Sequence, residues 1–213
     1  KLHNNEFETL IQPHGGAFVN YLSTTESDYC SESLRKIEVN SEAIMDAEQI
    51  AIGTFSPIDG FMDKETINSV LNDYRLPNGI VWTMPIFLQI QAAMKSKLKA
   101  GDCVSMVLEN TKDVFAVIDI QEVFEMNLTR MSQLMFNTTD LHHPGVKKLY
   151  SKGNLFIGGK VKLLKRLSSD YKYLELMPLQ MRTVFQRKGW NRIVGFHTRN
   201  VPHRVHEFIQ MQS

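Results

Sequence analysis

Short runs of β-branched and aromatic residues, separated by turn residues, fill the middle of this 213-residue chain. The first run begins after the Asn78-Gly79 pair, a dipeptide that strongly favours a hairpin turn. Three more runs cover residues 100–108, 114–124 and 153–164. Several short strands with turn residues between them are typical of a small barrel or sandwich. The sequence therefore predicts a small β-domain in the centre of the chain.

Helical spacing of apolar residues appears in three other segments. Residues 41–52 form an apolar stripe after Ser41, which is a suitable N-cap. A short helix is predicted at residues 131–136. The third helix is predicted to begin at Pro178 and to end before Gly189, because proline suits the first turn and glycine suits the position after the last one. Together with the strands, these helices indicate an α+β fold class.

The segment from Trp190 to His206 is the richest in side chains suited to binding or catalysis. Residues 192–196 are β-branched and aromatic and end at a glycine and a phenylalanine, as a strand that enters a loop would. Asn200 is a good N-cap, and Pro202 suits a first helical turn. The segment is therefore predicted to form a short strand, a polar loop and the start of a helix.

The predicted helix start combines two histidines with two arginines. His203 and His206 are three residues apart and would share one face at the N-terminal end of the helix. That end of a helix carries partial positive charge and free N–H groups, which suit a phosphate. Arg199 and Arg204 add fixed charge, and an arginine can hold an oxyanion with two parallel hydrogen bonds. The segment therefore predicts a site for polyanions, although an isolated pair of histidines is more often an ordinary surface feature.

A second histidine-containing segment, residues 137–146, is polar and rich in turn residues. Asp140, His142 and His143 could suggest a metal site, but adjacent histidines on an extended loop diverge and no third ligand is suitably spaced. We therefore interpret this segment as a structural loop that leaves the barrel and expect no metal ligands in the chain.

The overall charge gives no general argument for a polyanionic partner. The chain has 24 basic and 23 acidic residues, for a formal net charge of +1, which argues against nucleic-acid binding. No apolar run approaches a membrane span, and the N-terminus has no signal-peptide pattern. Cys30 and Cys103 lie far apart without metal spacing, which favours a reduced, cytoplasmic protein. The first residue, Lys1, leaves open whether the chain is a natural short protein or part of a longer product.

The run from Phe196 to Glu207 resembles the active-site signature of the ATP sulfurylases (sulfate adenylyltransferases), usually Gln-x-Arg-Asn-Pro-x-His-x-x-His. Arg199, Asn200, His203 and His206 match this signature at the family's spacing. The chain departs from it at His197, where the family usually has glutamine. The family's proline after the asparagine is replaced by valine, and a proline follows one position later.

The resemblance extends along nearly the whole chain. Four further segments look like family segments in the family's order: 10–16, 53–62, 138–146 and 182–190. This order implies a PUA-like β-barrel N-terminal domain at residues 1–148. The first part of a Rossmann-like α/β nucleotidyltransferase domain would follow at residues 149–213. Family subunits are about twice this long, and one βα unit cannot build a buried parallel sheet, so the catalytic domain would be incomplete in this chain.

The activity implied by the resemblance is the transfer of AMP from ATP to sulfate, which gives adenylyl sulfate and pyrophosphate. Arg199 would hold sulfate, and Asn200 would stabilise charge on the α-phosphoryl group. His203 and His206 would steady the phosphates of ATP and the pyrophosphate, with Mg²⁺ accompanying ATP. The rest of the substrate-binding segment would be His197 and Thr198. The family commonly forms homodimers or larger assemblies, so a homo-oligomer is also expected.

Two other functions stay open at the level of sequence. The barrel could serve as a binding or scaffolding module, because PUA-like folds also occur in RNA-binding proteins. The site could also transfer a nucleotidyl group to a different acceptor, because His-x-x-His sites serve several nucleotidyltransferases and His197 replaces a sulfate-binding glutamine. In every case we expect the 213-residue chain alone to lack transferase activity, since most of the nucleotide pocket would come from residues after Ser213.

Overall fold

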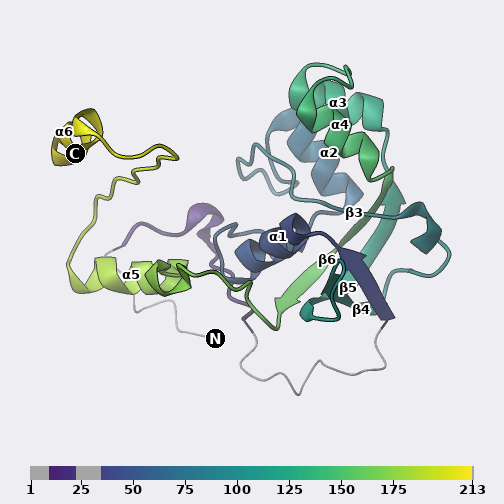
Figure 1. The fold of residues 1–213 in the computed structure, drawn as a ribbon, viewed down its shortest axis with the longest axis horizontal. Helices are drawn as coiled ribbons and strands as arrows, with labels where there is room; N and C mark the ends of the chain where they lie inside the picture. The colour runs from purple at the N-terminus through teal and green to yellow at the C-terminus, as the bar shows by residue number, and fades with distance from the viewer. Residues whose placement is uncertain (1–9, 23–34, 213) are drawn as a thin grey trace. The chain divides into compact units, whose positions relative to one another are not determined.

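A computed structural model describes residues 10–22 and 35–212. The chain divides into two compact units. One comprises Gln12–Pro178, and the other comprises Leu179–Ser213 together with Lys1–Ile11. Figure 1 shows the order of the elements along the chain. Among the described residues, no helix is both long enough and apolar enough to cross a membrane.

The unit of residues 12–178 is built on one six-stranded sheet. Its strands are β1 (Arg35–Val39), β2 (Gly60–Phe61), β3 (Leu88–Ile90), β4 (Cys103–Leu108), β5 (Val114–Glu125) and β6 (Leu155–Leu163). The strand order is β1-β4-β5-β6-β2, and β3 also pairs with β6. The predicted strands of the chain centre are thus confirmed at β4, β5 and β6.

The sheet is not closed into the predicted barrel. Within residues 10–22 and 35–212, the strand order ends at β1 on one side and at β2 on the other, and these two strands do not pair. The run after Gly79 was expected to be a long strand, but only its end, β3, joins the sheet. Pro85 lies in the middle of this run and cannot donate a ladder hydrogen bond. Before it, Val81 forms only an isolated antiparallel bridge with Arg75.

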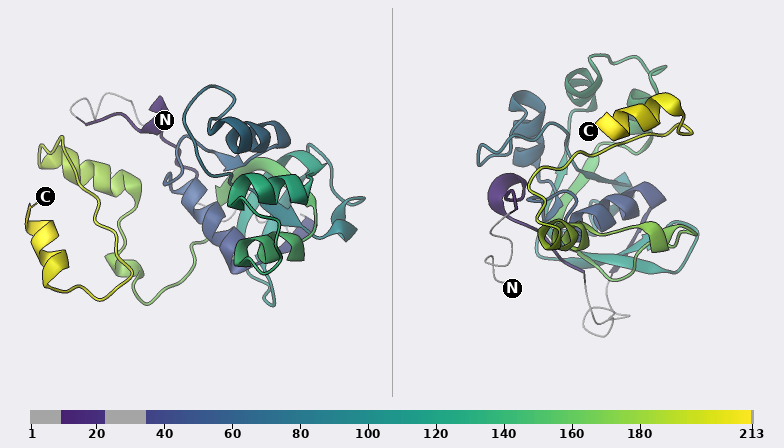
Figure 2. Two further views of the ribbon diagram at one scale, coloured as in Figure 1. Left: turned by 90° about the horizontal axis from the view of Figure 1, so that it is seen from above. Right: turned by 90° about the vertical axis from the view of Figure 1, so that its left-hand side faces the viewer.

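Helix α1 (Ser41–Ala51) lies against the sheet and buries one apolar face on it. Figure 1 shows α1 beside strand β6, and Figure 2 gives two further views of the same unit. Its side chains Ile44, Ala47 and Ile50 are fully buried in the main hydrophobic core. The predicted helix is confirmed, although its N-cap is Asn40 rather than Ser41, because the Asn40 side chain accepts the backbone N–H of Ala43 at 3.1 Å.

The described part of this unit contains further helices besides α1. They are η2 (His14–Gly16), α2 (Lys64–Asp73), η4 (Ala92–Met94), α3 (Leu128–Phe136), α4 (Pro144–Ser151) and η5 (Lys172–Leu174). Helix α3 confirms the short helix expected near residue 131. Helix α4 replaces the end of the segment that was expected to be a loop. It forms because the His143 ring accepts the N–H of Val146 and Pro144 occupies its first turn.

Strand β6 joins three other strands of the first unit. It pairs with β5 along nine residue pairs and also pairs with β2 and β3. A side chain at Gly159 would collide with the carbonyl oxygen of Asp119 on β5, so glycine is needed there for close strand approach. The compact unit therefore continues to Pro178.

The segment after β6 is tied to α1 by a buried carboxylate. The Glu48 side chain is 3% exposed and lies 2.7 Å from the Arg166 guanidinium and 2.7 Å from the Lys172 ammonium group. It also accepts the backbone N–H of Leu167 at 2.9 Å. Glu175 contacts the same two cations at 2.9 and 3.0 Å. Two carboxylates and two cations thus hold residues 166–175 against the helix.

This ion network sets the protonation of Glu48. Burial alone would raise the pKa of its carboxyl group. The hydrogen bonds from Lys172, from the Leu167 N–H and from Arg166 outweigh burial, so the pKa lies below the ordinary value of 4.5. A lowered carboxyl pKa stabilises the folded state above the unfolded-state pKa, and this stabilisation is lost as pH falls through the folded-state value.

We predict that Glu48→Gln destabilises the unit of residues 12–178. Removing the charge leaves two largely buried cations with only Glu175 as a partner. The expected loss is about 2–4 kcal/mol, somewhat below the roughly 3–5 kcal/mol of a fully buried pair, because both cations keep some contact with water. Urea unfolding of the parent and the variant measures this difference.

The matched control is Glu125→Gln, which removes the exposed ion pair with Lys95. An exposed pair contributes at most about 1 kcal/mol, so this variant should unfold close to the parent. The stability of the parent should also fall on acidification below about pH 4.5, and Glu48→Gln should reduce that dependence. Equal losses in the two variants would contradict the role of Glu48.

Candidate active site

Helix α5 (Pro178–Arg187) begins and ends where the sequence predicts. Gly189 follows it with a φ of 66°, a left-handed conformation that glycine adopts without strain. The backbone N–H of Trp190 then donates to the carbonyl of Phe185 at 2.9 Å, which folds the chain back over the last helical turn. The helix thus delivers the chain to the segment that carries the candidate site residues.

The predicted strand at residues 192–196 is not formed. Residues 190–203 have no regular secondary structure, and all of them are exposed. A strand is stable only when its backbone N–H and C=O groups pair with a neighbouring strand. No strand of the described residues pairs with this segment, so its strong β-propensity is not sufficient.

Helix α6 (Arg204–Gln212) begins later than predicted. Asn200 is not its N-cap, because it lies four residues before the first helical residue, Arg204. Its backbone N–H donates to Thr198 Oγ1 at 3.1 Å in a local turn. The cap position belongs to His203, whose Nδ1 accepts the N–H of Val205 at 3.3 Å. The carbonyl of His203 also accepts the first helical hydrogen bond, from Glu207, at 3.1 Å.

His203 and His206 cap the helix reciprocally. While His203 caps the N–H of Val205, the Nδ1 atom of His206 accepts the backbone N–H of His203 at 3.1 Å. The arrangement is similar to a capping box with imidazole nitrogens as acceptors, except that the cap residue accepts the N–H of the second helical residue, Val205, rather than that of the third. The two ring centroids are 4.0 Å apart, and the Phe196 ring stands edge-on to His206 at 5.9 Å.

These capping bonds determine which ring nitrogens can donate. An Nδ1 atom that accepts a hydrogen bond carries no proton, so in a neutral imidazole the proton lies on Nε2. Both histidines therefore offer an Nε2–H donor beside the N-terminus of α6. Their arrangement can bind an anion by hydrogen bonding without a proton transfer from either ring.

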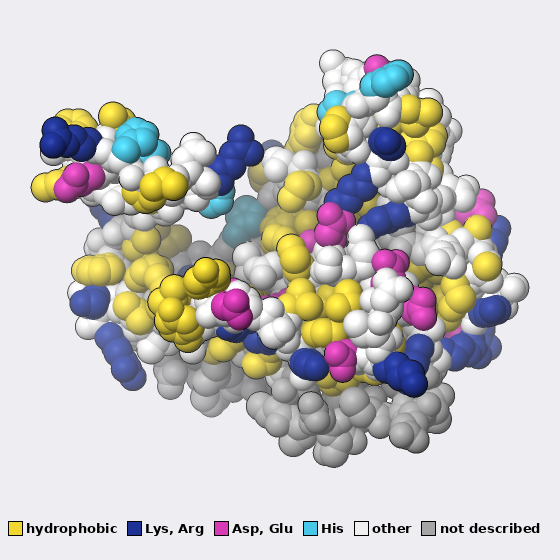
Figure 3. Space-filling model, viewed as in Figure 1, with side chains coloured by type: hydrophobic (Ala, Val, Ile, Leu, Met, Phe, Trp, Pro, Cys, Tyr) yellow, Lys and Arg dark blue, Asp and Glu magenta, His cyan; other side chains and the backbone are white. Residues whose placement is uncertain are grey.

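The side chains of the remaining candidate residues do not contact the histidine pair. Those of His197, Arg199 and Arg204 are exposed and make no hydrogen bond or ion pair with another described residue. Thr198 contacts only Asn200, through the local turn. Figure 3 shows basic, histidine and hydrophobic side chains together on the surface of the α6 segment. Two cations and two N–H donors thus occupy one short stretch of chain.

Sequence reasoning missed the exposure of this region's apolar side chains. Neither α5 nor α6 buries any residue. Val201 is 86% exposed and Phe208 is 65% exposed. Isolated exposed apolar residues are common, but a whole amphipathic helix without a covered face is not. The apolar periodicity of residues 204–212 could have indicated this, because an apolar stripe on a helix normally packs against another surface.

Neither the His142–Asp140 pair nor Cys103 provides an alternative active site. His142 contacts Asp140 at 2.9 Å, but its side chain is 98% exposed, and no group of three potential ligands among the described residues could hold a metal ion. Burial, with the Asp119 carboxylate beside it, raises the pKa of the Cys103 thiol to about 11, so this cysteine is a poor nucleophile at neutral pH. Cys30 lies outside the described residues.

Comparison with protein families divides the chain into two matched segments. Residues 11–166 match the model of the PUA-like domain. Residues 172–213, which include the histidine pair and the arginines, match the model of ATP-sulfurylase. The chain therefore belongs to the family of the PUA-like domain, and its last part is similar to ATP-sulfurylase. The resemblance found in the sequence is thus confirmed.

Individual relatives are similar to nearly the whole chain. A sulfate adenylyltransferase from Persephonella marina is 39% identical over 208 residues, which are 94% of this chain and 53% of that protein. One from a Synechococcus strain is 37% identical over 94% of this chain and 52% of that protein. The chain therefore spans about half the length of the curated relatives it matches.

A solved structure has the same fold. It is described as a hexameric APS kinase from Thiobacillus denitrificans and superposes with a TM-score of 0.72 at 20% identity. The match covers 95% of this chain and 37% of that chain. At this identity the likeness concerns the fold alone.

We predict that the cap histidines stabilise α6 through their Nδ1 atoms. His203→Ala should expose the Val205 amide to hydrogen exchange and fray the helix, at a cost of about 1 kcal/mol. His203→Asn should keep the cap, because an asparagine oxygen can accept the same N–H. Amide exchange followed by NMR checks both variants. Equal protection of Val205 in the parent and in His203→Ala would contradict the assignment.

Proposed function

We propose that the chain is the N-terminal portion of an enzyme that transfers AMP from ATP to sulfate, giving adenylyl sulfate and pyrophosphate. The observation that carries the proposal is the start of α6, where two cap histidines present Nε2–H donors beside two arginines. The same residues stand at the family's signature positions. The relatives named sulfate adenylyltransferase support this reaction over a scaffolding role.

The proposed chemistry is charge stabilisation rather than acid–base catalysis. A sulfate oxygen attacks the α-phosphorus of ATP in line, the new P–O bond forms, and the bond to pyrophosphate breaks. The attacking dianion carries no proton that must be removed. The protein therefore gains most by positioning the two anions and neutralising the charge that develops on the phosphoryl oxygens.

Each candidate residue has a role in this proposal. Arg199 binds sulfate with its planar guanidinium, and Asn200 donates to the α-phosphoryl oxygens. His203 and His206 donate from Nε2 to the β- and γ-phosphates and to the departing pyrophosphate. The remaining substrate contacts are Thr198, through its hydroxyl, and the His197 ring. The assignment rests on the signature spacing and on the positive field at the start of α6.

Mg²⁺ enters this proposal as a companion of ATP. Residues 197–206 contain no carboxylate, and carboxylate or phosphate oxygens are the ligands that Mg²⁺ prefers. The ion would therefore be held by the phosphate oxygens of ATP rather than by this segment. There it would neutralise part of the negative charge on the phosphates.

The proposal also assigns the domains. The PUA-like domain would end after β6, later than the boundary at residue 148 that was expected from the sequence. The residues from about 172 onward would begin a Rossmann-like nucleotidyltransferase domain, in line with the family match. The exposed apolar faces of α5 and α6 would then be covered by further parts of that domain. Assembly into a homo-oligomer belongs to the same proposal.

We predict that Arg199→Ala removes most of the activity of the longest natural product that contains this chain. Losing a charge-assisted hydrogen bond in a closed site costs about 2–4 kcal/mol, or roughly thirty- to a thousand-fold in rate. Sulfate-dependent release of pyrophosphate from ATP measures the effect. Arg187→Ala, at the exposed end of α5, is the control and should leave the rate unchanged. Pyrophosphate release from ATP in the absence of any added oxyanion would contradict the proposed reaction.

His197 tests the identity of the acceptor. If its ring contacts the oxyanion, replacing it changes the hydrogen-bonding groups that meet the acceptor. His197→Gln restores the family's usual residue, so it should still bind sulfate while its relative affinity for other oxyanions changes. Affinities for sulfate, molybdate and phosphate are measured in competition for both proteins. Identical relative affinities in the two proteins would leave His197 without a role in binding.

A further inference from the structure

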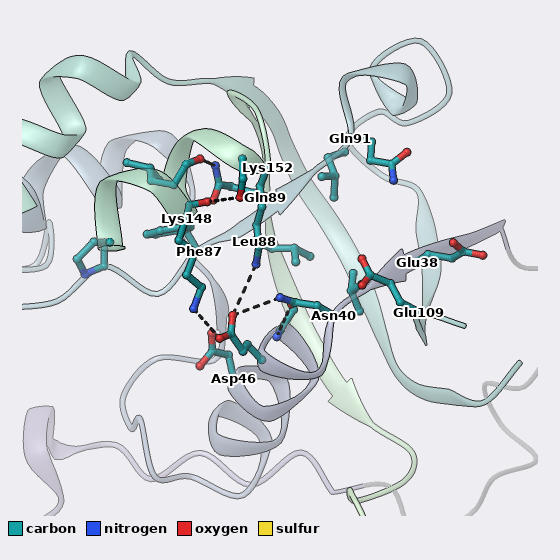
Figure 4. Close-up of a pocket in the computed structure, with 18 of the residues that line it drawn as sticks. Glu38, Asn40, Asp46, Phe87, Leu88, Gln89, Gln91, Glu109, Lys148 and Lys152 are labelled. Carbon is teal, nitrogen blue, oxygen red and sulfur yellow. Dashed lines mark hydrogen bonds and ion pairs between the residues drawn. The ribbon is translucent and has the colours of Figure 1, made fainter. Parts of the chain in front are cut away.

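Two features of the unit of residues 12–178 play no part in the proposed reaction: a cavity and an exposed apolar patch. The cavity has a volume of about 500 Å³ and is lined by residues of α1, β3 and α4, among others (Figure 4). Its lysines, Lys148 and Lys152, lie 2.6 and 3.8 Å from Glu42. The Gln89 amide donates to two backbone carbonyls at 3.0 and 2.6 Å. These groups are satisfied within the unit, so they indicate no ligand.

The apolar patch consists of Tyr171, Tyr173, Leu174 and Leu176. Each of these side chains is more than half exposed, and that of Tyr173 is 79% exposed. A single exposed tyrosine or leucine is ordinary in a folded protein, but four within six residues are not. Contiguous apolar surface of this kind marks a place where another surface packs.

The backbone explains why these side chains point outward. Residues 172–174 form η5, a 3₁₀ turn in which side chains three positions apart eclipse one another. The backbone N–H of Glu175 donates to the carbonyl of Lys172 at 3.1 Å, so these two residues share one side of the turn. Both belong to the ion network around Glu48. The apolar side chains are therefore left on the other sides of the turn.

The ion network also holds the patch in place. Arg166 and Lys172 each contact the buried carboxylate of Glu48 on α1, and Glu175 contacts the same two cations. A surface that is already ordered loses less conformational entropy when a partner packs on it than a mobile loop does. The network thus presents the patch in a fixed conformation.

Exposed apolar side chains are concentrated in the last part of the chain. Among the described residues, thirteen large hydrophobic side chains of residues 171–211 are exposed, against eight in the much longer part before them. The match to ATP-sulfurylase begins at residue 172, and the chain spans about half the length of its curated relatives. A surface that covers the patch is therefore expected in the other half of those relatives.

A second copy of this chain fits the patch less well. A stable interface between separate molecules takes about 20–30 residues from each side, whereas the patch has four. A domain of the same polypeptide needs less area, because the covalent link keeps it at a high effective concentration. The size of the patch therefore favours an attached domain.

We propose that the patch is the surface of this unit on which the remaining part of the nucleotidyltransferase domain packs, namely the part beyond residue 213 in a longer product. The proposal rests on the proposed function, which supplies that domain. The partner surface is apolar, because the charged groups beside the patch, Lys172 and Glu175, are already paired.

Nitration of tyrosines by tetranitromethane, followed by mass spectrometry, tests the docking surface. It is applied to this 213-residue chain and to the longest natural product that contains it. Tyr173 should react at least about ten-fold more slowly in the longest product, because a covered residue reacts only when the contact opens. Tyr74, which follows α2 and is 56% exposed, is the internal control and should react equally in both. Dilution should not change the protection of Tyr173.

Three outcomes would overturn the proposal. They are equal reactivity of Tyr173 in the two proteins, slow nitration already in this chain, and protection that is lost on dilution, which would assign the patch to a second copy. Sulfate-dependent pyrophosphate release from the same preparation keeps the proposed reaction separate. Protection of Tyr173 without adenylyl transfer would contradict the reaction and leave the docking surface standing.

Two variants of the longest product locate the contact. Leu174→Ser and Leu141→Ser are a matched pair, because both leucines are more than half exposed in this chain. Leu174→Ser should speed the nitration of Tyr173 at least about three-fold, because an apolar contact is lost. Leu141→Ser should not change the rate. Circular dichroism confirms that each variant is folded, and an unchanged nitration rate in folded Leu174→Ser would contradict the docking role of the patch.

Discussion

The pairing of β6 with three other strands is the interaction on which most of this structure depends. Residues from β2, β3 and β5 come from three separate parts of the sequence, and β6 brings them into one sheet. Close strand approach at Gly159 makes this possible, because a side chain there would meet the backbone of β5. The position of β3 on β6 also fixes one wall of the cavity.

Charge organises the two regions of functional interest in opposite ways. At the start of α6, backbone N–H groups, two histidine donors and nearby arginines favour an anion. In the PUA-like unit, by contrast, Glu42 pairs with Lys148 and Lys152 and neutralises part of their charge. Both regions thus follow from which charged groups are paired with each other, rather than from the net charge of the chain.

The sequence predicted the elements whose signals are local. Helices α1 and α5 and the strands β4 and β5 have their periodicity and end residues within a dozen positions. The strand predicted at residues 192–196 is not formed, because a strand must pair with another strand, and a local sequence pattern does not show whether such a partner is present. Helix α4 was missed because its cap is a histidine, a residue rarely expected there. The motif located the candidate active site, but the reciprocal histidine cap and the cavity depend on contacts that only the fold reveals.

The proposed role of the start of α6 in adenylyl transfer to sulfate is tested most directly in the reverse reaction, the formation of ATP from adenylyl sulfate and pyrophosphate. The protein for this measurement is the longest natural product that contains this chain. ATP should appear only when both compounds are present, and substituting His203 and His206 together by alanine should abolish its formation. ATP formation at the parental rate in that double variant would contradict a role of the two histidines in adenylyl transfer.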